Sequence, residues 1–226
     1  MDDVKRCIES ALARCENMAA EVVVVDNGSR DGTGQWLEQL SLTDSRIRVI
    51  HTDHVLGEGA AKSILLKQCL GQTIVMLDTS VEISGDIYTP IEALLNKEDT
   101  GVVGPFGLRT DDFHHFHDGE GESGEMDAMQ AYCFAFRRIR LKAVGLPRET
   151  FRFYRNLDLD YSFQFKDNGF KVIADADLPV TLHEHRVWTS LAEGERDELS
   201  KKNYGRFLDK WGERSDLLTN SVPHSH

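Results

Sequence analysis

The sequence has few cysteines and no long apolar run. Its 226 residues include four cysteines, in apolar contexts and without the Cys-x-x-Cys spacing of zinc sites or a disulfide framework. We interpret them as reduced core residues: Cys7, Cys15, Cys69 and Cys133. No stretch approaches the ~20 apolar residues that a membrane span needs, and no charged-then-apolar signal segment opens the chain. A soluble, cytoplasmic chain is therefore expected.

Positive charge is also scarce. The chain has 26 Lys and Arg against 38 Asp and Glu, a net charge of −12. Because an acidic surface repels phosphate backbones and anionic lipid headgroups, we expect no nucleic acid and no membrane surface as a primary partner. No repeat and no Pro- or Ser-rich linker divides the chain, so a single domain is predicted.

What the sequence does contain is an alternation of strand and helix patterns. Residues 21–26 (EVVVVD) form a β-branched run typical of a strand buried on both faces. Further strands are predicted at 46–51, 73–77, 101–103, 129–136, 170–174 and 178–182. Helices are predicted at 3–19, 35–40, 57–70, 86–96, 157–167 and 193–211, with a short one after 136. For the 157–167 helix we expect Asn156 as N-cap and Gly169 just past the C-terminus. The alternation predicts an α/β fold with a doubly wound, mostly parallel sheet flanked by helices.

Residues 109–127 interrupt this alternation. They hold His114, His115 and His117 and the acidic, glycine-rich run HDGEGESGE. The segment is too polar to pack, so an exposed, mobile loop is expected there.

Polar residues follow three of the predicted strands. They are Asp26 with Asn27, then His51, then Asp78. Open parallel sheets bind ligands at the carboxyl ends of their strands, although Asp and Asn at such positions also cap helices. Their recurrence favours a binding site.

Two nucleotide motifs fail at the segment GEGAAKS. A Walker A loop needs Gly directly before Lys, where Ala61 stands, and Lys62 occupies the place of the third glycine of a dinucleotide fingerprint. Neither motif is therefore predicted.

Two further groups are open to a structural or a functional interpretation. His183 and His185 lie two apart after a strand, so both side chains should share a face and could bind a divalent cation with a distant carboxylate. Val187 replaces the second histidine of a zincin motif. Asp158 and Asp160 lie in the first turn of a predicted helix, where the helix dipole favours carboxylates whether or not they react.

The order of five segments resembles the inverting family 2 glycosyltransferases with the GT-A fold. The segments, over roughly residues 20–190, are VVVVDNGSRDGT, GEGAAKS, IVMLDTSVE, AYCFAFRR followed by VGLPRETFRFYRNLDLDYSFQFKDNGFKV, and HEHRVW. The resemblance implies transfer of a sugar from a nucleoside-diphosphate sugar to a glycan, lipid-linked or protein acceptor, with inversion. It implies a nucleotide-binding half at about 1–105, an acceptor half at about 106–190 and a C-terminal helix at about 193–212.

The same resemblance implies roles for individual residues. Asp26, Asn27 and Ser29 match the turn that contacts the nucleoside. Asp78 matches the first residue of an Asp-x-Asp that holds ribose and a metal-bound diphosphate, and Asp158 matches the general base.

Two departures accompany these matches, because Ser80 replaces the second Asp and Leu157 replaces a Glu before the base. The implied cation, Mn²⁺ or Mg²⁺, would be held by Asp78 with His183 or His185. Whether the chain requires it stays open.

Acceptor contacts are expected from Asp160, from Trp188 and from the polar loop. An aromatic face such as that of Trp188 can stack on a sugar, and a mobile loop can close over one. A homodimer stays open.

A larger departure lies at the start of the chain. Family members usually begin with a strand that reads like SVVIPTYN, and none precedes the first helix here. That strand would lie between the strands at 22–25 and 73–77. We expect those two strands to pair directly, or the natural chain to begin upstream, rather than a partner strand to fill the gap. The alternative function is a non-catalytic GT-A-like module that binds sugar or protein. A nucleotidyltransferase is disfavoured because no Gly-rich Arg/Lys activation loop is present.

Overall fold

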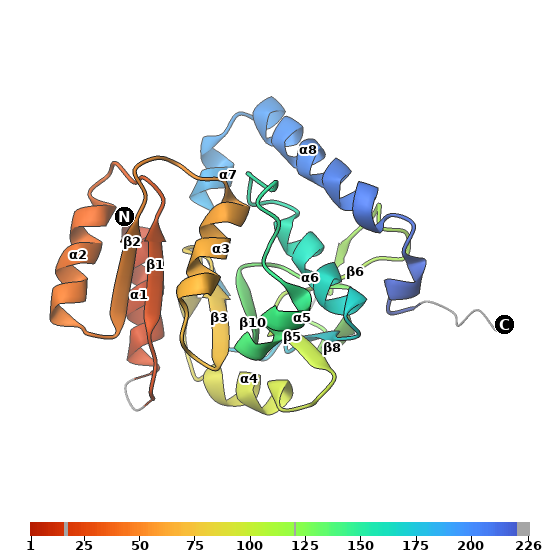
Figure 1. Cartoon of the computed structure of the whole chain (residues 1–226), viewed down its shortest axis with the longest axis horizontal. Coiled ribbons are helices and arrows are strands. Elements are labelled where there is room, and N and C mark those ends of the chain that lie inside the picture. The colour runs from red at the N-terminus through yellow and green to blue at the C-terminus, as the bar shows by residue number, and fades with distance from the viewer. Residues whose placement is uncertain (16–17, 120, 221–226) are drawn as a thin grey trace.

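The computed structural model describes residues 1–15, 18–119 and 121–220 (Figure 1). The helices are α1 (Asp2–Ala13), α2 (Thr33–Thr43), α3 (Glu58–Gln68), α4 (Tyr88–Leu95), α5 (Leu141–Val144), α6 (Leu157–Asp167), α7 (Arg186–Ser190) and α8 (Glu193–Trp211), with short 3₁₀ turns η1 (Arg138–Arg140) and η2 (Ser215–Leu217). The strands are β1 (Val22–Asp26), β2 (Ile47–His51), β3 (Thr73–Leu77), β4 (Val81–Ile83), β5 (Thr100–Gly104), β6 (Gly107–Arg109), β7 (His117–Asp118), β8 (Gly124–Met126), β9 (Ala128–Met129), β10 (Cys133–Arg137), β11 (Lys171–Ala174) and β12 (Val180–Leu182).

The strands form one larger sheet and three small ones. The larger sheet has the order β3-β10-β5-β11-β8, and β1 pairs with β2 in a separate parallel sheet. The expected α/β class is confirmed. The larger sheet is mixed rather than mostly parallel, because β10 lies between β3 and β5 and runs antiparallel to both, which leaves β5–β11 as its parallel pair.

Strand β10 is the centre of the core and packs helices on both faces. Phe134 and Phe136 belong to a cluster that includes side chains of α3, α5 and α6. Cys133 and Ala135 point the other way, into a cluster with side chains of α1 and α4. Successive strand residues face opposite sides of a sheet, so this alternation of large and small residues sets which helices cover each face.

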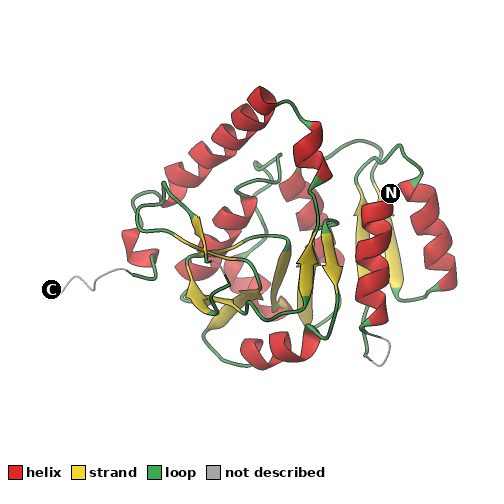
Figure 2. Ribbon diagram, turned by 180° about the vertical axis from the view of Figure 1, so that it is seen from behind, coloured by secondary structure: helices red, strands yellow, loops and turns green. Residues whose placement is uncertain are grey.

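Of the two alternatives expected for the missing first strand, direct pairing of β1 with β3 is wrong. Among the described residues, β1 pairs only with β2, and β3 pairs only with β10. Helix α1 instead links the two sheets from one side, as Figure 2 shows in part. Its Ile8 and Leu12 pack with β1 and β2, while Ala11 packs with β3 and the Cys7 Sγ lies 3.4 Å from the Asp78 carbonyl oxygen. Apolar contact through a helix thus replaces backbone pairing.

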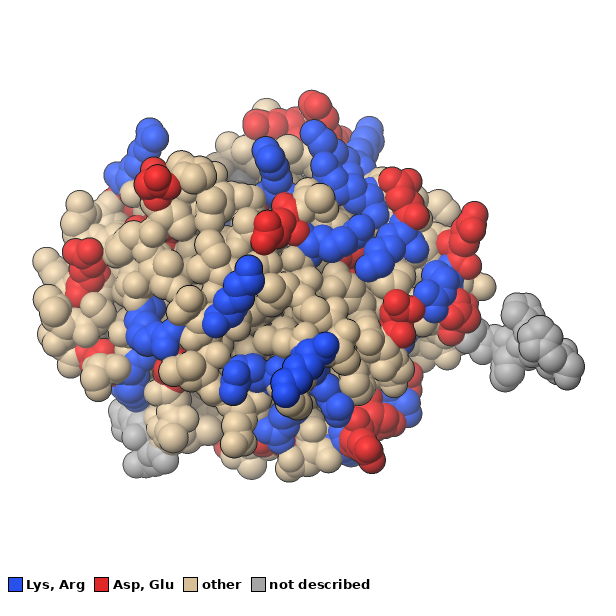
Figure 3. Space-filling model, viewed as in Figure 1, with Lys and Arg blue, Asp and Glu red and all other residues tan. Residues whose placement is uncertain are grey.

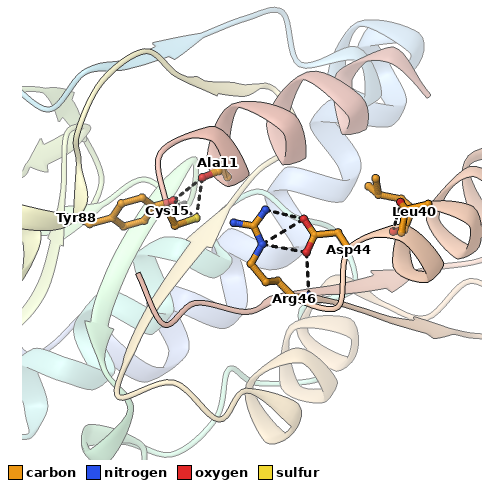
Figure 4. Close-up of polar contacts among 7 residues, drawn as sticks. Ala11, Cys15, Leu40, Asp44, Arg46 and Tyr88 are labelled. Atoms are coloured by element: carbon orange, nitrogen blue, oxygen red, sulfur yellow. Dashed lines mark hydrogen bonds and ion pairs between the residues drawn. The ribbon is translucent and has the colours of Figure 1, made fainter. Parts of the chain in front are cut away.

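Helix α1 is shorter than predicted, ending at Ala13 rather than residue 19. The chain turns so that Cys15 is buried and its N–H donates to the Leu12 carbonyl. Figure 4 shows the junction that follows, where the Tyr88 hydroxyl donates to the Ala11 carbonyl at 3.2 Å and lies 3.8 Å from the Cys15 Sγ. The four cysteines are free, as predicted, and three of them are buried.

The sequence predicts an exposed, mobile loop at residues 109–127. That prediction of exposure is wrong at Phe113 and Asp127, which are buried. Phe113 is 2% exposed and packs against Phe163 and Phe207, and Asp127 is fully buried. The Asp127 carboxylate accepts the Thr110 N–H and pairs with Lys166 at 3.1 Å. Long-range contacts therefore hold a segment whose composition predicts a loop.

The ends of the two long C-terminal helices test the capping predictions. Gly169 follows α6 with φ 78°, which confirms it as the residue past the helix C-terminus. Asn156 stands at the N-cap position, but its side chain does not cap; it donates to the Ser200 carbonyl at 3.2 Å. The bounds of α8 match the prediction. No helix in the described part of the chain is long and apolar enough to cross a membrane.

Candidate active site

A cavity of about 380 Å³ lies where β3 ends, between α3 and the start of α6. Its lining combines Asp78 after β3, Glu58 and Lys62 of α3, and Asp158 of α6. The rest comes mainly from the 108–118 segment, residues 130–132, and the approach to α6: Leu108, His114, Phe116, Asp118, Gln130, Ala131, Tyr132, Tyr154, Arg155, Asn156, Leu159 and Tyr204. The cavity therefore opens at the sheet edge where the sequence predicts a ligand site.

Asp78 is held as a carboxylate by neighbours on both of its oxygens. Its Oδ1 accepts the backbone N–H of Ser80 at 2.8 Å as well as the Ser80 hydroxyl, and its Oδ2 lies 3.4 Å from Nε2 of His185. Burial alone would raise the pKa of Asp78, but the hydrogen bonds from His185 and Ser80 outweigh it and lower the pKa to about 2. Asp78 is therefore anionic at neutral pH.

His185 is fixed by aromatic neighbours. The ring of Tyr154 stacks on it at 4.2 Å between centroids and an angle of 18°, and Tyr132 approaches edge-on at 6.2 Å. Burial disfavours the charged imidazolium, yet Asp78 outweighs this effect, so the pKa of His185 is raised. The stack holds the ring with Nε2 toward Asp78.

The pKa of Asp158 is shifted in the opposite direction to that of Asp78. Its Oδ2 accepts the Ala131 N–H at 3.2 Å and its Oδ1 the Leu159 N–H at 3.0 Å. Burial raises the pKa of Asp158, and these hydrogen bonds oppose that rise only in part. A carboxylate with a raised pKa, partly exposed at a cavity, is a stronger base than an ordinary one.

Lys62 supplies positive charge between these two acids. Its Nζ lies 2.7 Å from Oε1 of Glu58, one turn earlier on α3. Burial would lower the pKa of Lys62, but Glu58, Asp78 and Asp158 together raise it. The lysine stays protonated, and Arg155 adds a second cation to the cavity lining.

The divalent cation that the family resemblance implies would need oxygen or nitrogen ligands near Asp78. Among the described residues no cluster of three His, Cys, Asp or Glu side chains forms a metal cage. Asp78 and His185 nevertheless offer one carboxylate oxygen and one imidazole nitrogen 3.4 Å apart. Both donor types suit Mn²⁺, and cations bound with nucleotides commonly take their remaining ligands from phosphate and water. These two residues fit a cation that a bound diphosphate would help to hold.

The other predicted histidine lies elsewhere. The Nε2 of His183 is 2.8 Å from Oε2 of Glu82 on β4. Neither His183 nor His185 lines the cavity itself, but His185 contacts Asp78, which does. The two histidines therefore contact different carboxylates, and the choice of His183 or His185 as a metal ligand stays a prediction. The chain leaves β12 at Leu182 and bends into α7, so the strand alternation that would align the two rings does not continue to His185.

Asp160 is placed in the core, which corrects its predicted contact with an acceptor. Its carboxylate is fully buried and pairs with Arg148, whose Nε lies 2.9 Å from Oδ2. Trp211 Nε1 donates to the same carboxylate at 2.8 Å and Gln164 Nε2 at 2.9 Å. The group is satisfied internally and does not line the cavity. It ties α6 to α8.

Trp188 lies beside the site on α7 without lining the cavity. The guanidinium carbons of Arg155 and Arg196 lie 4.7 and 4.9 Å from its ring centroid, and Tyr154 meets it edge-on. Stacking of a sugar on this ring would compete with those cations.

The predicted nucleoside turn forms, but apart from the cavity lining. Asp26 accepts the Ser29 N–H at 3.0 Å and faces His51 Nδ1 at 3.0 Å. The Asn27 side chain both accepts from and donates to the backbone of Leu56, which fixes the segment that leads into α3. These residues order the turn after β1, and their contact with a nucleoside stays a prediction.

Sequence reasoning missed Lys62, Tyr132, Tyr154 and Arg155 as cavity residues. The rejection of GEGAAKS as a nucleotide motif set Lys62 aside with it. A usable signal was the Glu58–Lys62 pair at helical i,i+4 spacing, in the helix that follows β2.

Comparison with known proteins places the chain in a family. The sequence model described as Glycosyl transferase family 2 matches residues 2–160. The chain therefore belongs to glycosyltransferase family 2. Its GT-A fold agrees with solved structures. A crystal structure of GalNAc-T7 with UDP, GalNAc and Mn²⁺ has a TM-score of 0.79 at 18% identity, covering 95% of this chain and 47% of that one. The mannosyltransferase PcManGT from Pyrobaculum calidifontis, in complex with GDP-Man and Mn²⁺, has a TM-score of 0.68 at 14% identity, covering 96% and 65%.

Similar curated sequences match over shorter stretches. Glycosyltransferase GlyG of Streptococcus pneumoniae is 26% identical over 98 residues, which are 43% of this chain and 32% of that protein. Succinoglycan biosynthesis protein ExoO of Rhizobium meliloti is 36% identical over 85 residues, 38% of this chain and 24% of that protein. The matches thus span a third or less of these two relatives.

Proposed function

We propose that this chain transfers a sugar from a nucleoside-diphosphate sugar to an acceptor hydroxyl with inversion at the anomeric carbon. The carrying observation is that two carboxylates with oppositely shifted pKa values, Asp78 and Asp158, line one cavity. When the surroundings lower the pKa of one acid and raise that of the other, the first stays charged and the second can accept a proton in the reaction. Membership of glycosyltransferase family 2 supports the reaction class.

The proposed reaction is a single displacement. Asp158 accepts the proton of the acceptor hydroxyl as its oxygen forms a bond to the anomeric carbon. The bond from that carbon to the diphosphate oxygen breaks, and its electron pair leaves with the nucleoside diphosphate. Lys62 and Arg155 would offset the negative charge that develops there. One base near the acceptor and cations near the leaving group are what this chemistry requires.

Asp78 and His185 would hold a Mn²⁺ or Mg²⁺ ion. Such a cation supplies Lewis-acid stabilisation of the diphosphate. The Mn²⁺ in the solved GalNAc-T7 and PcManGT structures supports this assignment. Only neutral imidazole can be a metal ligand, and the pKa of His185 is raised. Cation binding would therefore have to displace a proton from His185.

We assign the acceptor to a second cavity of about 290 Å³ beside the first. The two share Asp118, Gln130 and Tyr132 in their linings, and the second adds Phe106 and Leu182. Gln130 donates to Asp118 at 3.0 Å between them. Aromatic and apolar surface with a few polar groups suits a sugar face. This proposal replaces Asp160 as the acceptor contact.

The test of the proposed function is a thermal-shift panel of nucleoside diphosphates with and without Mn²⁺, followed by turnover of the sugar nucleotide that binds. A ligand at a hundredfold excess over its dissociation constant stabilises the folded chain by about 2.7 kcal/mol. Asp158→Asn should bind the same nucleotide and lose turnover. Binding without turnover in both proteins would favour the non-catalytic module, and no nucleotide binding at all would contradict the proposed function.

A further inference from the structure

Basic side chains gather at one end of the larger sheet, although the whole chain is acidic. Strands β3 and β10 are antiparallel with Thr73 opposite Arg137, so the loop before β3 lies beside the turn after β10. The backbone N–H of Arg138 donates to the Gln72 carbonyl at 2.8 Å, and its Nε donates to that of Gly71 at 2.9 Å. We call this surface the basic end; it comprises Lys67, Leu70, Arg138, Ile139, Arg140 and Lys142.

The cations of the basic end are not neutralised. Among the residues that the structure describes, none of its four Lys and Arg side chains forms an ion pair with a carboxylate. Figure 3 shows Lys and Arg gathered in the lower middle of the visible face, with few Asp and Glu among them.

Three nearby acids are paired with cations outside the basic end, whereas Glu98, whose carbonyl accepts from Arg140, forms no ion pair in the described chain. Glu21 pairs with Arg48 at 3.4 Å, Glu92 with Arg137 at 2.7 Å and Asp99 with Lys171 at 2.9 Å. The basic end therefore carries a local excess of positive charge that the net charge of −12 conceals.

Two large apolar side chains lie among these cations. Leu70 is 67% exposed and Ile139 is 59% exposed, so both are among the most exposed large hydrophobic residues of the described chain. Leu70 is the second residue past α3 and precedes Gly71, and Ile139 follows Arg138, so the contact of Arg138 with Gly71 places the two apolar residues in one region. Exposed apolar side chains surrounded by Lys and Arg are typical of surfaces that lie in the interface of an anionic membrane.

We infer that the basic end docks on an anionic lipid bilayer. Lys67, Arg138, Arg140 and Lys142 would contact the headgroups, while Leu70 and Ile139 would enter the interface below them. The apolar pair favours lipid over nucleic acid, since a nucleic-acid surface would gain little from aliphatic side chains and more from stacking aromatic ones. The negative net charge of the whole chain does not oppose such docking, because charges beyond about a Debye length are screened.

The position of the basic end sets how the docked molecule would be oriented. Asp78 lies at the opposite end of β3, five residues from Thr73, which at about 3.3 Å per residue is on the order of 17 Å. The candidate active site would therefore face away from the bilayer, open to solvent. An acceptor would reach it from the aqueous side.

The experiment is co-sedimentation of the full chain with vesicles of phosphatidylcholine alone and of phosphatidylcholine mixed with phosphatidylserine. We expect binding only to the mixed vesicles, and loss of it in high salt. Arg138→Glu/Lys142→Glu should weaken binding more than tenfold, since each cation near an anionic surface contributes about fivefold and reversal adds repulsion. Leu70→Ser/Ile139→Ser should also weaken binding while leaving the charge unchanged.

The matched control is Lys201→Glu/Lys202→Glu, which reverses two exposed lysines on α8 and changes the net charge equally. It should bind mixed vesicles at near the wild-type level. Equal loss in the control would overturn the inference, because only net charge would then matter. Binding to pure phosphatidylcholine, or no vesicle binding, would overturn it as well. So would tighter binding to an oligonucleotide that depends on Arg138 and Lys142. Melting temperatures of all variants exclude unfolding as the cause of any loss.

Discussion

Asp158 and Asp160 stand two residues apart on α6, yet neutralising them should have opposite effects. Asp160→Asn leaves one acceptor oxygen where two now receive hydrogen bonds from Arg148, Trp211 and Gln164. The new amide NH₂ group would then face N–H groups that need an acceptor. Two hydrogen bonds to a charged group are worth about 1.5–3 kcal/mol each. Because the Arg148 side chain is 29% exposed and regains some hydration, we expect a loss of about 3 kcal/mol.

Asp158→Asn should change stability by no more than about 1 kcal/mol. The amide loses one of the two backbone hydrogen bonds that the carboxylate accepts. That loss is offset because burial raises the pKa of Asp158, so the charged form is disfavoured in the folded chain and its removal is favourable. The general base is lost, however, and turnover should fall by about 10² to 10⁴.

Two measurements separate these effects. In a chain of this size about 1 kcal/mol corresponds to roughly 2–4 °C, so Asp160→Asn should melt about 6–12 °C lower and Asp158→Asn within about 4 °C of wild type. Turnover is compared at a temperature where both variants are folded, and there Asp160→Asn should stay within several-fold of wild type. Similar melting shifts for both variants, or near wild-type turnover for Asp158→Asn, would refute the division of roles.

Three further outcomes are expected at the same site. In calorimetry, Mn²⁺ should tighten binding of a nucleoside diphosphate. Asp78→Ala or His185→Ala should remove that gain in affinity, whereas His183→Ala should not. Equal effects of the two histidine variants would contradict a role for His185 alone. Because the pKa of His185 is raised, its protonated form stabilises the fold fully below the unfolded pKa of about 6.5, and this stability is lost as pH rises through the folded pKa. The free energy of unfolding, measured with denaturant, should therefore decline over that pH range, and His185→Gln should flatten the decline. Mn²⁺ affinity should rise over the same range, because the imidazole loses its proton there. Nucleoside diphosphate should bind weakly, with a dissociation constant on the order of millimolar, or about −4 kcal/mol. In the described chain no strand lies between β1 and β3, so the nucleoside pocket lacks the wall that such a strand would form. Micromolar binding would contradict this prediction.

Much of the architecture could be predicted from local patterns. The run at 21–26 and the apolar run at 73–77 became β1 and β3, and the turn residue Gly169 marks the end of α6. These succeed because strand alternation, helix spacing and positive φ are fixed within a few residues of sequence. Strand pairing is not, and the separation of β1 from β3 depends on how α1 fills the space beside them.

The candidate site was predictable in part. Asp78 was found because it follows a strand at the ligand edge, whereas Asp158 was identified only through the resemblance to family 2 glycosyltransferases, because carboxylates are favoured at helix starts whether or not they react. Assigning Asp160 to the same site ignored helix geometry, since residues two apart point to opposite sides of a helix. Which of the two faces the core depends on Arg148 and on Trp211, 51 residues away from Asp160, and no local pattern reveals such a partner.

The separation of β1 from β3 has a consequence for hydrogen exchange. Val22 N–H donates to Arg46 and the Asp26 carbonyl accepts from Thr52, so by strand alternation the amides of Val23 and Val25 point away from β2. Those amides have no backbone acceptor among the described residues. Their deuterium uptake should be fast while that of Val24 is slow, although all three lie in one strand. The β1–β2 pair would then open as a cooperative unit of its own, with a lower protection factor than β10, because apolar contacts and no shared ladder join it to the larger sheet.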